Sequence, residues 1–168
     1  MIVVRFKFCM GLVRYIFRGK RIVLLKRVLL LPLLLFSFVT IAQPDDIYDP
    51  SRDALSDFKS ALTSASVEQK NIFVIAGGNW CSYCHRFEKN LKDASLDEVL
   101  ENDFVLIKVN YSEENYNEGF FSLFPDIHIF PHIMIVSANG ELLESTPVPS
   151  TEDEFKRLLA KYTIEKSA

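Results

Sequence analysis

The sequence predicts an α/β domain in which a central mixed β-sheet is flanked by helices on both faces. Two short apolar runs, residues 71–78 and 104–110, have the composition of buried strands. Apolar residues on both sides of Asn139-Gly140 indicate a β-hairpin, for which this dipeptide is the strongest short signal. Segments with apolar residues at helical spacing precede, separate and follow these strands. The resulting order is α-β-α-β-(α)-β-β-α, ending in a hairpin and a helix.

The first helix is predicted over residues 51–66, before the first strand. Ser51 is a good N-cap residue and marks its expected start. The apolar residues of this segment recur at the spacing of one helix face: Leu55, Phe58 and Leu62.

A second helix is expected to begin near Cys81, directly after the first strand. Cys84, Phe87 and Leu91 have the spacing of one apolar face. The charged residues of this helix are expected to lie in water: Arg86, Glu88, Lys89 and Lys92.

The rest of the domain contains shorter elements. Ser95 can cap a short helix through Leu100. Residues 111–130 are polar with interspersed aromatics, and we expect a loop with a helical turn there. Residues 150–162 are predicted as the last helix, because Ser150 and Asp153 have capping-box spacing before an apolar face.

The N-terminal segment differs in composition from the rest of the chain. Residues 1–42 hold eight of the 19 Lys and Arg residues and no Asp or Glu, so the remainder carries a net charge of −11. This basic segment leads into an apolar run, residues 28–42, and the pattern is typical of a secretory signal peptide. Cleavage is expected after Ala42, with an uncleaved signal anchor as the alternative and Met10 as a possible start. We therefore expect an exported, periplasmic protein.

The domain organisation follows from this division. Residues 43–50 are interpreted as a lead-in, and residues 51–168 as one domain without repeats or internal linkers. The strongly acidic composition beyond the leader argues against binding to nucleic acid, because few cations are available to neutralise phosphates. We expect a monomer.

The cysteines point to chemistry at one site. Cys9 falls in the leader, so the exported domain retains only Cys81 and Cys84, in an oxidising compartment. A disulfide that closes so short a loop stabilises little, because the entropy removed from the unfolded chain grows with loop length. The Cys81–Cys84 pair is therefore better explained by reactivity than by structural stapling.

Three chemistries use the stretch Asn79-Trp-Cys-Ser-Tyr-Cys-His85: a redox dithiol, covalent haem attachment, or part of a zinc site. The strand signals argue against haem, because small cytochromes of that kind are largely helical. Zinc is disfavoured because His128 and His132 do not form a second tight ligand pair. We expect neither a metal nor another cofactor, since a dithiol stores the electrons itself.

A strand followed by Trp80-Cys-x-x-Cys84 at a helix start, and Phe130-Pro131 before a hairpin, resembles the thioredoxin superfamily over about residues 51–165. The short exported thioredoxin-like proteins are the most similar, and Cys-x-Tyr-Cys-His also resembles bacterial disulfide isomerases. The resemblance implies a thioredoxin-like fold and a thiol–disulfide oxidoreductase, with the direction of exchange open. The alternative is a peptide-binding or chaperone module without catalysis.

The position of Cys81 at a helix N-terminus supports this resemblance. Free N–H groups and the helix dipole favour an anion there, and a thiol in such a motif has its pKa lowered from about 8.5 to roughly 3.5–7.5. Cys81 is thus the expected nucleophile and Cys84 the resolving thiol, joined as a Cys81–Cys84 disulfide in the oxidised state. His85, Arg86 and Lys89 are expected to add positive potential.

The resemblance also implies roles for residues around the dithiol. Pro131 is expected to be cis and to face the cysteines, with Phe130 offering backbone hydrogen bonds to an extended substrate. Trp80 is expected to pack beside Cys81, and Tyr83 is placed among the substrate contacts. The expected substrates are cysteine-containing segments of exported proteins, and a membrane or soluble redox partner must reset the pair.

One position departs from thioredoxin. Thioredoxin has a buried Asp on the strand before its motif, and Ile75 takes that place here. Lys108 matches the lysine that accompanies this Asp, although it can equally be a strand lysine with its ammonium in water. His128 is predicted at the surface, and His132 at the rim of the active-site face, where it can touch substrate.

Overall fold

The computed structural model describes residues 46–165. The predictions about the leader, including Cys9, the start at Met10 and cleavage after Ala42, lie outside the described residues. Within residues 46–165, none of the helices has the length and apolar composition needed to cross a membrane.

The sheet has four strands: β1 (Asn71–Gly77), β2 (Phe104–Asn110), β3 (His132–Val136) and β4 (Leu142–Pro147). Their order in the sheet is β2-β1-β3-β4. β1 pairs with β2 in parallel, whereas β3 is antiparallel to both β1 and β4. The mixed sheet and the C-terminal hairpin are therefore confirmed.

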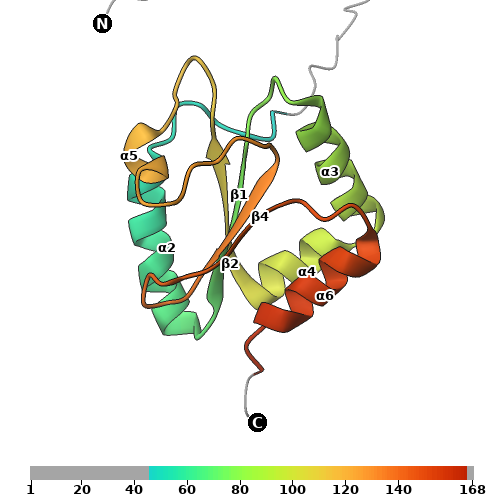
Figure 1. Cartoon of the computed structure of the whole chain (residues 1–168). Coiled ribbons are helices and arrows are strands. Elements are labelled where there is room, and N and C mark those ends of the chain that lie inside the picture. Colours follow the sequence, from blue (N-terminus) through green and yellow to red (C-terminus); the bar gives the residue numbers. More distant parts are fainter. Residues whose placement is uncertain (1–45, 166–168) are drawn as a thin grey trace, which may run out of the picture. The chain divides into compact units, whose positions relative to one another are not determined.

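Helices cover both faces of this sheet, as predicted. The described helices are α2 (Ala54–Glu68), α3 (Ser82–Asp93), α4 (Leu96–Asp103), α5 (Glu118–Phe121) and α6 (Glu152–Tyr162). In Figure 1, α2 and α5 lie on one side of the sheet, while α3, α4 and α6 lie on the other. This arrangement is the predicted thioredoxin-like α/β fold.

Strand β1 is buried throughout because both of its faces are covered. Ile72 and Val74 belong to the apolar cluster beneath α2 and α5. Phe73 and Ile75, which point to the opposite face, belong to the cluster beneath α3, α4 and α6. The continuous apolar run in the sequence is thus the signature of the central strand.

The first helix begins later than predicted. Asp53, and not Ser51, is the N-cap residue of α2, because its Oδ1 accepts hydrogen bonds from the N–H groups of Leu55 at 3.0 Å and Ser56 at 3.2 Å. The Ser51 hydroxyl instead donates to Asp49 Oδ1 at 2.7 Å. Because the Ser51 hydroxyl is bonded within this turn, Asp53 caps the helix instead.

The last helix also uses a different cap. Thr151 and Glu154 form the capping box of α6, so the prediction of Ser150 and Asp153 was wrong by one residue. Both pairs have the required spacing, and the sequence pattern alone does not distinguish them.

The prediction for Ser95 was partly wrong, whereas the hairpin predicted at Asn139-Gly140 is present. Ser95 occupies the N-cap position of α4 without a side-chain hydrogen bond, at φ 53°, and this helix continues past Leu100. The hairpin connection spans residues 137–141, where Ser137 N–H donates to the Glu141 carbonyl at 2.9 Å and Gly140 has φ 84°. Gly140 alone takes the left-handed conformation, as in longer hairpin loops.

Candidate active site

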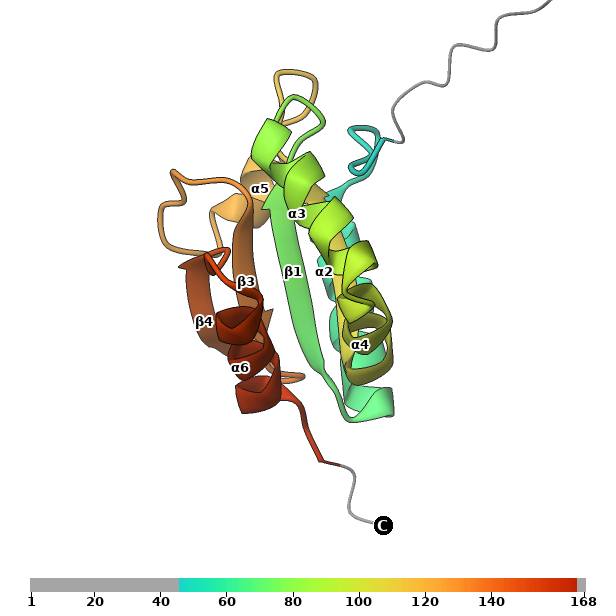
Figure 2. The ribbon, with the colours of Figure 1, turned by 90° about the vertical axis from the view of Figure 1, so that its right-hand side faces the viewer.

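The dithiol motif lies where β1 ends and α3 begins. Cys81 is the N-cap residue of α3, with extended backbone angles of φ −90° and ψ 103°. Cys81 and Cys84 form a disulfide, and their Cα atoms are 5.2 Å apart. Figure 2 shows the loop from β1 into α3 at one end of the sheet, near the loop that precedes α5.

The start of α3 provides hydrogen-bond donors for the first sulfur. The backbone N–H of Cys84 donates to Cys81 Sγ at 3.1 Å. The first N–H groups of a helix have no partner within the helix, and the helix dipole adds positive potential at this end. Such donors at a helix start stabilise an anionic sulfur.

Both sulfurs lie in an apolar environment. Cys81 is 4% exposed and Cys84 is 1% exposed, so burial alone does not distinguish a nucleophile from a resolving thiol. The difference lies in position, because Cys81 caps the helix whereas Cys84 is one turn inside it. Cys84 belongs to the apolar cluster beneath α3, as its helical spacing predicted.

Asn79 ties the N-terminal lead-in to the active-site loop. Its Oδ1 accepts hydrogen bonds from the N–H groups of Ile47 and Tyr48, both at 3.0 Å, and its Nδ2 donates to the Tyr48 carbonyl at 2.7 Å. His85 Nε2 is 2.8 Å from the Asn79 carbonyl oxygen, to which it donates. His85 therefore positions the loop, a role that the sequence reasoning missed.

Tyr48 places a buried hydroxyl near the second sulfur. The side chain is 2% exposed and packs in the same cluster as Cys84. A Cβ on Gly77 would stand 2.6 Å from Tyr48 Oη and 2.7 Å from Cys84 Sγ, so both atoms border this glycine. Burial, together with the nearby Glu88 carboxylate, raises the pKa of Tyr48, and its hydroxyl stays protonated.

Glu88, one helical turn after Cys84 in α3, forms an ion pair with Lys108 of β2. Lys108 Nζ is 2.7 Å from Glu88 Oε1, and the two side chains are 29% and 13% exposed. The prediction that Glu88 faces water was therefore wrong. Lys108 pairs in register with Ile75, so a carboxylate from α3 stands beside the lysine where thioredoxin uses an acid from the strand. The Cys84–Glu88 spacing of four could have revealed this, because such residues share one helix face.

Aromatic rings surround the exposed side of the motif. Trp80 is 61% exposed, and its Nε1–H donates to the Tyr111 carbonyl at 2.7 Å. The ring centroids of Trp80 and Phe130 are 6.1 Å apart, and Tyr111 stacks on Phe130 at 4.9 Å. Phe130 thus joins the motif to the segment before β3, although the two are far apart in sequence.

Pro131 and Tyr83 flank this region. The Phe130–Pro131 peptide bond is cis, the isomer that the resemblance implied. Tyr83 is 64% exposed, and the Arg86 guanidinium lies 4.7 Å from its ring centroid. Tyr83 and Trp80 are the large side chains that the motif presents to solvent.

His132 does not lie at an exposed rim. It is 7% exposed, and its Nε2 is 2.9 Å from Ser145 Oγ on β4. Burial lowers the pKa of His132. The prediction of a substrate-accessible His132 was wrong, because the first residue of β3 already faces a covered side of the sheet. His128 is exposed, as predicted.

Comparison with a solved structure supports the fold. A disulphide isomerase from Xylella fastidiosa Temecula1 is 22% identical over 68% of this chain and 95% of its own, with a TM-score of 0.60. The C-terminal domain of Neisseria meningitidis DsbD in the oxidised form is 15% identical over 64% of this chain and 95% of its own, with a TM-score of 0.49. Among curated proteins, none matches the sequence.

The sequence model of a family described as thioredoxin-like matches residues 53–138, about half of the chain. The matched segment contains β1, the dithiol motif, α3, β2 and the cis proline. With the mixed sheet and the disulfide at the start of α3, this match shows that the chain belongs to the thioredoxin-like family.

Proposed function

We propose that the chain is an exported thiol–disulfide oxidoreductase in which Cys81 is the nucleophile and Cys84 the resolving thiol. The observation that carries this proposal is the hydrogen bond from Cys84 N–H to Cys81 Sγ at the start of α3, in a pair that forms a disulfide. A sulfur held by a helix N-terminus is a good attacking and leaving group, and exchange requires both properties.

The chemistry needs two exchange steps. The Cys81 thiolate attacks one sulfur of a substrate disulfide, a mixed disulfide forms, and the first substrate thiolate leaves. Cys84 then loses its proton and attacks Cys81 Sγ, which closes the Cys81–Cys84 disulfide and releases the second substrate thiolate. The reverse sequence oxidises a substrate dithiol.

The Glu88–Lys108 pair is proposed to take the proton of Cys84. Ile75 cannot do so, and Glu88 lies one helical turn after Cys84 with its carboxylate largely buried. The Lys108 ammonium pairs with this carboxylate at 2.7 Å, and the protonated Tyr48 hydroxyl borders the sulfur. In this proposal Lys108 is a supporting residue through its pairing with Glu88.

Substrates are proposed to be extended, cysteine-containing segments of exported proteins. Phe130, Pro131 and Tyr83 would line their path beside the dithiol, and Trp80 would contact them through its exposed ring. A separate redox partner must reset the pair, while the protein itself acts as a monomer without a cofactor. The acidic composition of residues 43–168 speaks against nucleic acid as a partner.

A peptide-binding module without catalysis is the second candidate. The observation in its favour is the exposure of Trp80 and Tyr83, at 61% and 64%, next to a disulfide that is almost completely buried. Such a module would bind peptides equally well after Cys81→Ser, whereas an oxidoreductase would lose its exchange activity.

The deciding measurement is the reduction potential of the pair in the full chain, by equilibration with glutathione buffers. A reduction potential near about −120 mV would indicate a protein that donates disulfides. A potential near about −270 mV would indicate a reductant. In parallel, Cys84→Ser is expected to accumulate a mixed disulfide with a substrate peptide. A pair that does not exchange with glutathione, and traps no peptide, would overturn the proposal.

A further inference from the structure

A groove of about 490 Å³ borders the dithiol motif on the side of the loop that follows β2. Its walls include the aromatic rings of Trp80, Tyr111 and Tyr116. Among the described residues that line it, the charged ones are Glu113 and Glu114. Trp80 directly precedes Cys81, so a polypeptide whose cysteine meets Cys81 passes alongside this groove.

The loop that carries the two glutamates is held in place on two sides. Tyr111 N–H donates to the Gly77 carbonyl, and the Tyr111 carbonyl accepts from Trp80 Nε1, at 2.6 Å and 2.7 Å. On the other side, Asn115 Nδ2 donates to the Pro50 carbonyl at 2.9 Å. Because these bonds already order the loop, ligand binding would lose little conformational entropy there.

Nothing in the neighbouring sequence supplies compensating cations. No Lys or Arg stands between Lys108 and Lys156, a stretch that includes the whole loop and the segment leading to Pro131. Arg52 touches the loop through its backbone, but its guanidinium binds Asp57 at 2.7 Å through two nitrogens. Neither glutamate of the groove forms an ion pair with another residue in the part of the chain that the structure describes.

The helix that follows the motif carries a cation near the dithiol. Arg86 lies over the ring of Tyr83 at 4.7 Å, and both side chains are exposed in the first two turns of α3. The motif is therefore bordered by a cation on α3 and by two carboxylates at the groove. Charges of both signs next to the dithiol can favour one orientation of a charged, extended segment.

We propose that this groove selects substrate segments that carry an arginine or lysine close to the reacting cysteine. The aliphatic stem of such a residue packs on the aromatic walls, and its cation lies over a ring face while it pairs with Glu113 or Glu114. Arginine fits best, since its planar guanidinium stacks on aromatic rings and binds a carboxylate with two hydrogen bonds. The inference rests on the proposed oxidoreductase function and names its substrate class.

The test uses three synthetic peptides that differ only in the residues next to a single cysteine: arginine, glutamine or glutamate. Each peptide is activated as a 2-pyridyl disulfide, and release of thiopyridone by the reduced full chain gives the second-order rate constant. We expect the arginine peptide to react roughly threefold to tenfold faster than the glutamine peptide, and the glutamate peptide to react slowest. Raising the salt concentration should reduce the difference.

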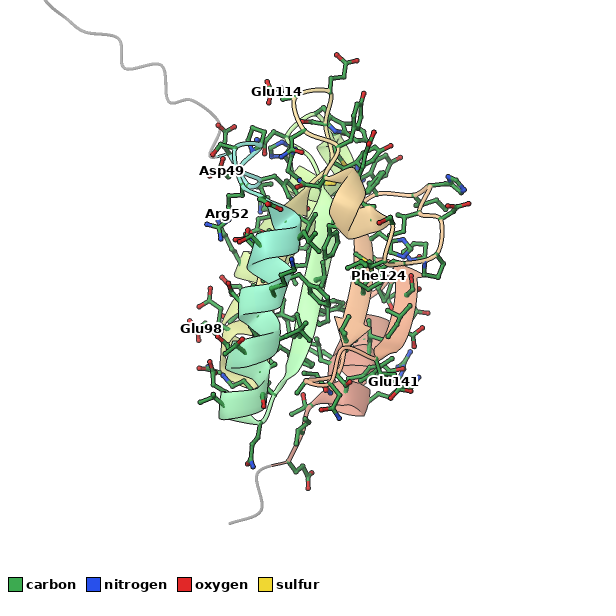
Figure 3. The ribbon with its side chains drawn as sticks, turned by 90° about the vertical axis from the view of Figure 1, so that its left-hand side faces the viewer. Asp49, Arg52, Glu98, Glu114, Phe124 and Glu141 are labelled. Atoms are coloured by element: carbon green, nitrogen blue, oxygen red, sulfur yellow. A yellow bond between two sulfur atoms is a disulfide. The ribbon has the colours of Figure 1, made fainter. Side chains whose placement is uncertain are left out.

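The variant Glu113→Gln/Glu114→Gln should abolish this preference. A matched control, Glu98→Gln/Glu141→Gln, changes the net charge equally and should retain it. Both control residues are exposed, and Figure 3 shows Glu98 and Glu141 away from the end of the domain where Glu114 lies. A preference that survives in the Glu113/Glu114 variant would overturn the inference.

Failure of the inference and failure of the function give different results. The neutral disulfide 2,2′-dithiodipyridine reports exchange without charge selection. Equal rates for the three peptides, with normal reaction of this reagent, would overturn the groove inference alone. No reaction with any disulfide would overturn the proposed function and the groove inference with it.

Discussion

The two faces of strand β1 bury different chemistry. Beneath α2 and α5 the cluster consists of aliphatic side chains and phenyl rings, such as Phe58 against Phe120 at 5.6 Å between centroids. Beneath α3 and α6 the cluster is also largely apolar, but it includes the disulfide and Tyr48. The first face mainly stabilises the fold, while the second also carries reactive groups in an apolar wall. Changes on the two faces should therefore affect different measurements.

The largest expected effect is on the reactive face. Cys81→Ser should remove measurable disulfide exchange, because a serine hydroxyl neither attacks nor leaves as a thiolate does. The free energy of unfolding should change little, since the lost disulfide closes only a short loop. Insulin reduction and urea unfolding of the same preparation check both parts, and residual exchange through Cys84 alone would contradict the assignment of the nucleophile.

A change beneath α2 and α5 should affect stability and leave the dithiol unchanged. Phe58 is 6% exposed, and Phe58→Ala should lower the free energy of unfolding by about 3–5 kcal/mol. The reduction potential of the dithiol should stay within about 15 mV of the parent value, which corresponds to less than a fourfold change in the exchange constant. A larger shift would show that the two faces of the sheet are coupled.

Two glycines allow a matched test of the comparison. Gly77→Ala would bring a methyl group to 2.6 Å from Tyr48 Oη and 2.7 Å from Cys84 Sγ, and should cost about 1–3 kcal/mol and shift the reduction potential. Gly119→Ala in α5 would meet only Leu55 at 3.8 Å. It should stabilise the protein by up to about 1 kcal/mol, since alanine is the better helix former. Similar effects of the two changes on the potential would refute this distinction.

Glu88→Gln should slow the resolving step by roughly tenfold or more, because a neutral amide cannot accept the proton of Cys84. The rate of mixed-disulfide resolution, followed from pH 5 to pH 9, should be lower than that of the parent at each pH. Glu101→Gln, at an exposed residue of α4, is the control. Resolution at the parent rate and with the parent pH profile would remove Glu88 from the mechanism.

The smallest expected effect concerns His132, a buried polar residue at the start of β3. Burial lowers the pKa of folded His132 below 6.5. As the pH falls through 6.5, the unfolded chain binds a proton at this residue before the folded chain does, so the free energy of unfolding should fall. Urea midpoints at pH 7.5 and 5.5 should differ more for the parent than for His132→Gln. An equal pH response of both proteins would assign the effect to other groups.

Local patterns in the sequence predicted most of the fold. The apolar runs of β1 and β2, the hairpin around Gly140 and the dithiol at the start of α3 depend on residues that are neighbours along the chain. The first residue of a helix was predicted less accurately, because adjacent residues such as Ser150 and Thr151 can both act as N-caps. Tertiary hydrogen bonds and turns then select one of them.

The sequence by itself determined the order of the elements, the cysteine pair at a helix N-terminus and a proline before β3, because spacing and capping express these features locally. Only the tertiary structure decided that Asn79 holds Tyr48 beneath the dithiol and that Glu88 meets Lys108. These pairs are separated by 31 and 20 residues. The period of a helix or strand specifies which side of an element a residue occupies. The packing of elements across the sheet specifies which residue it meets there.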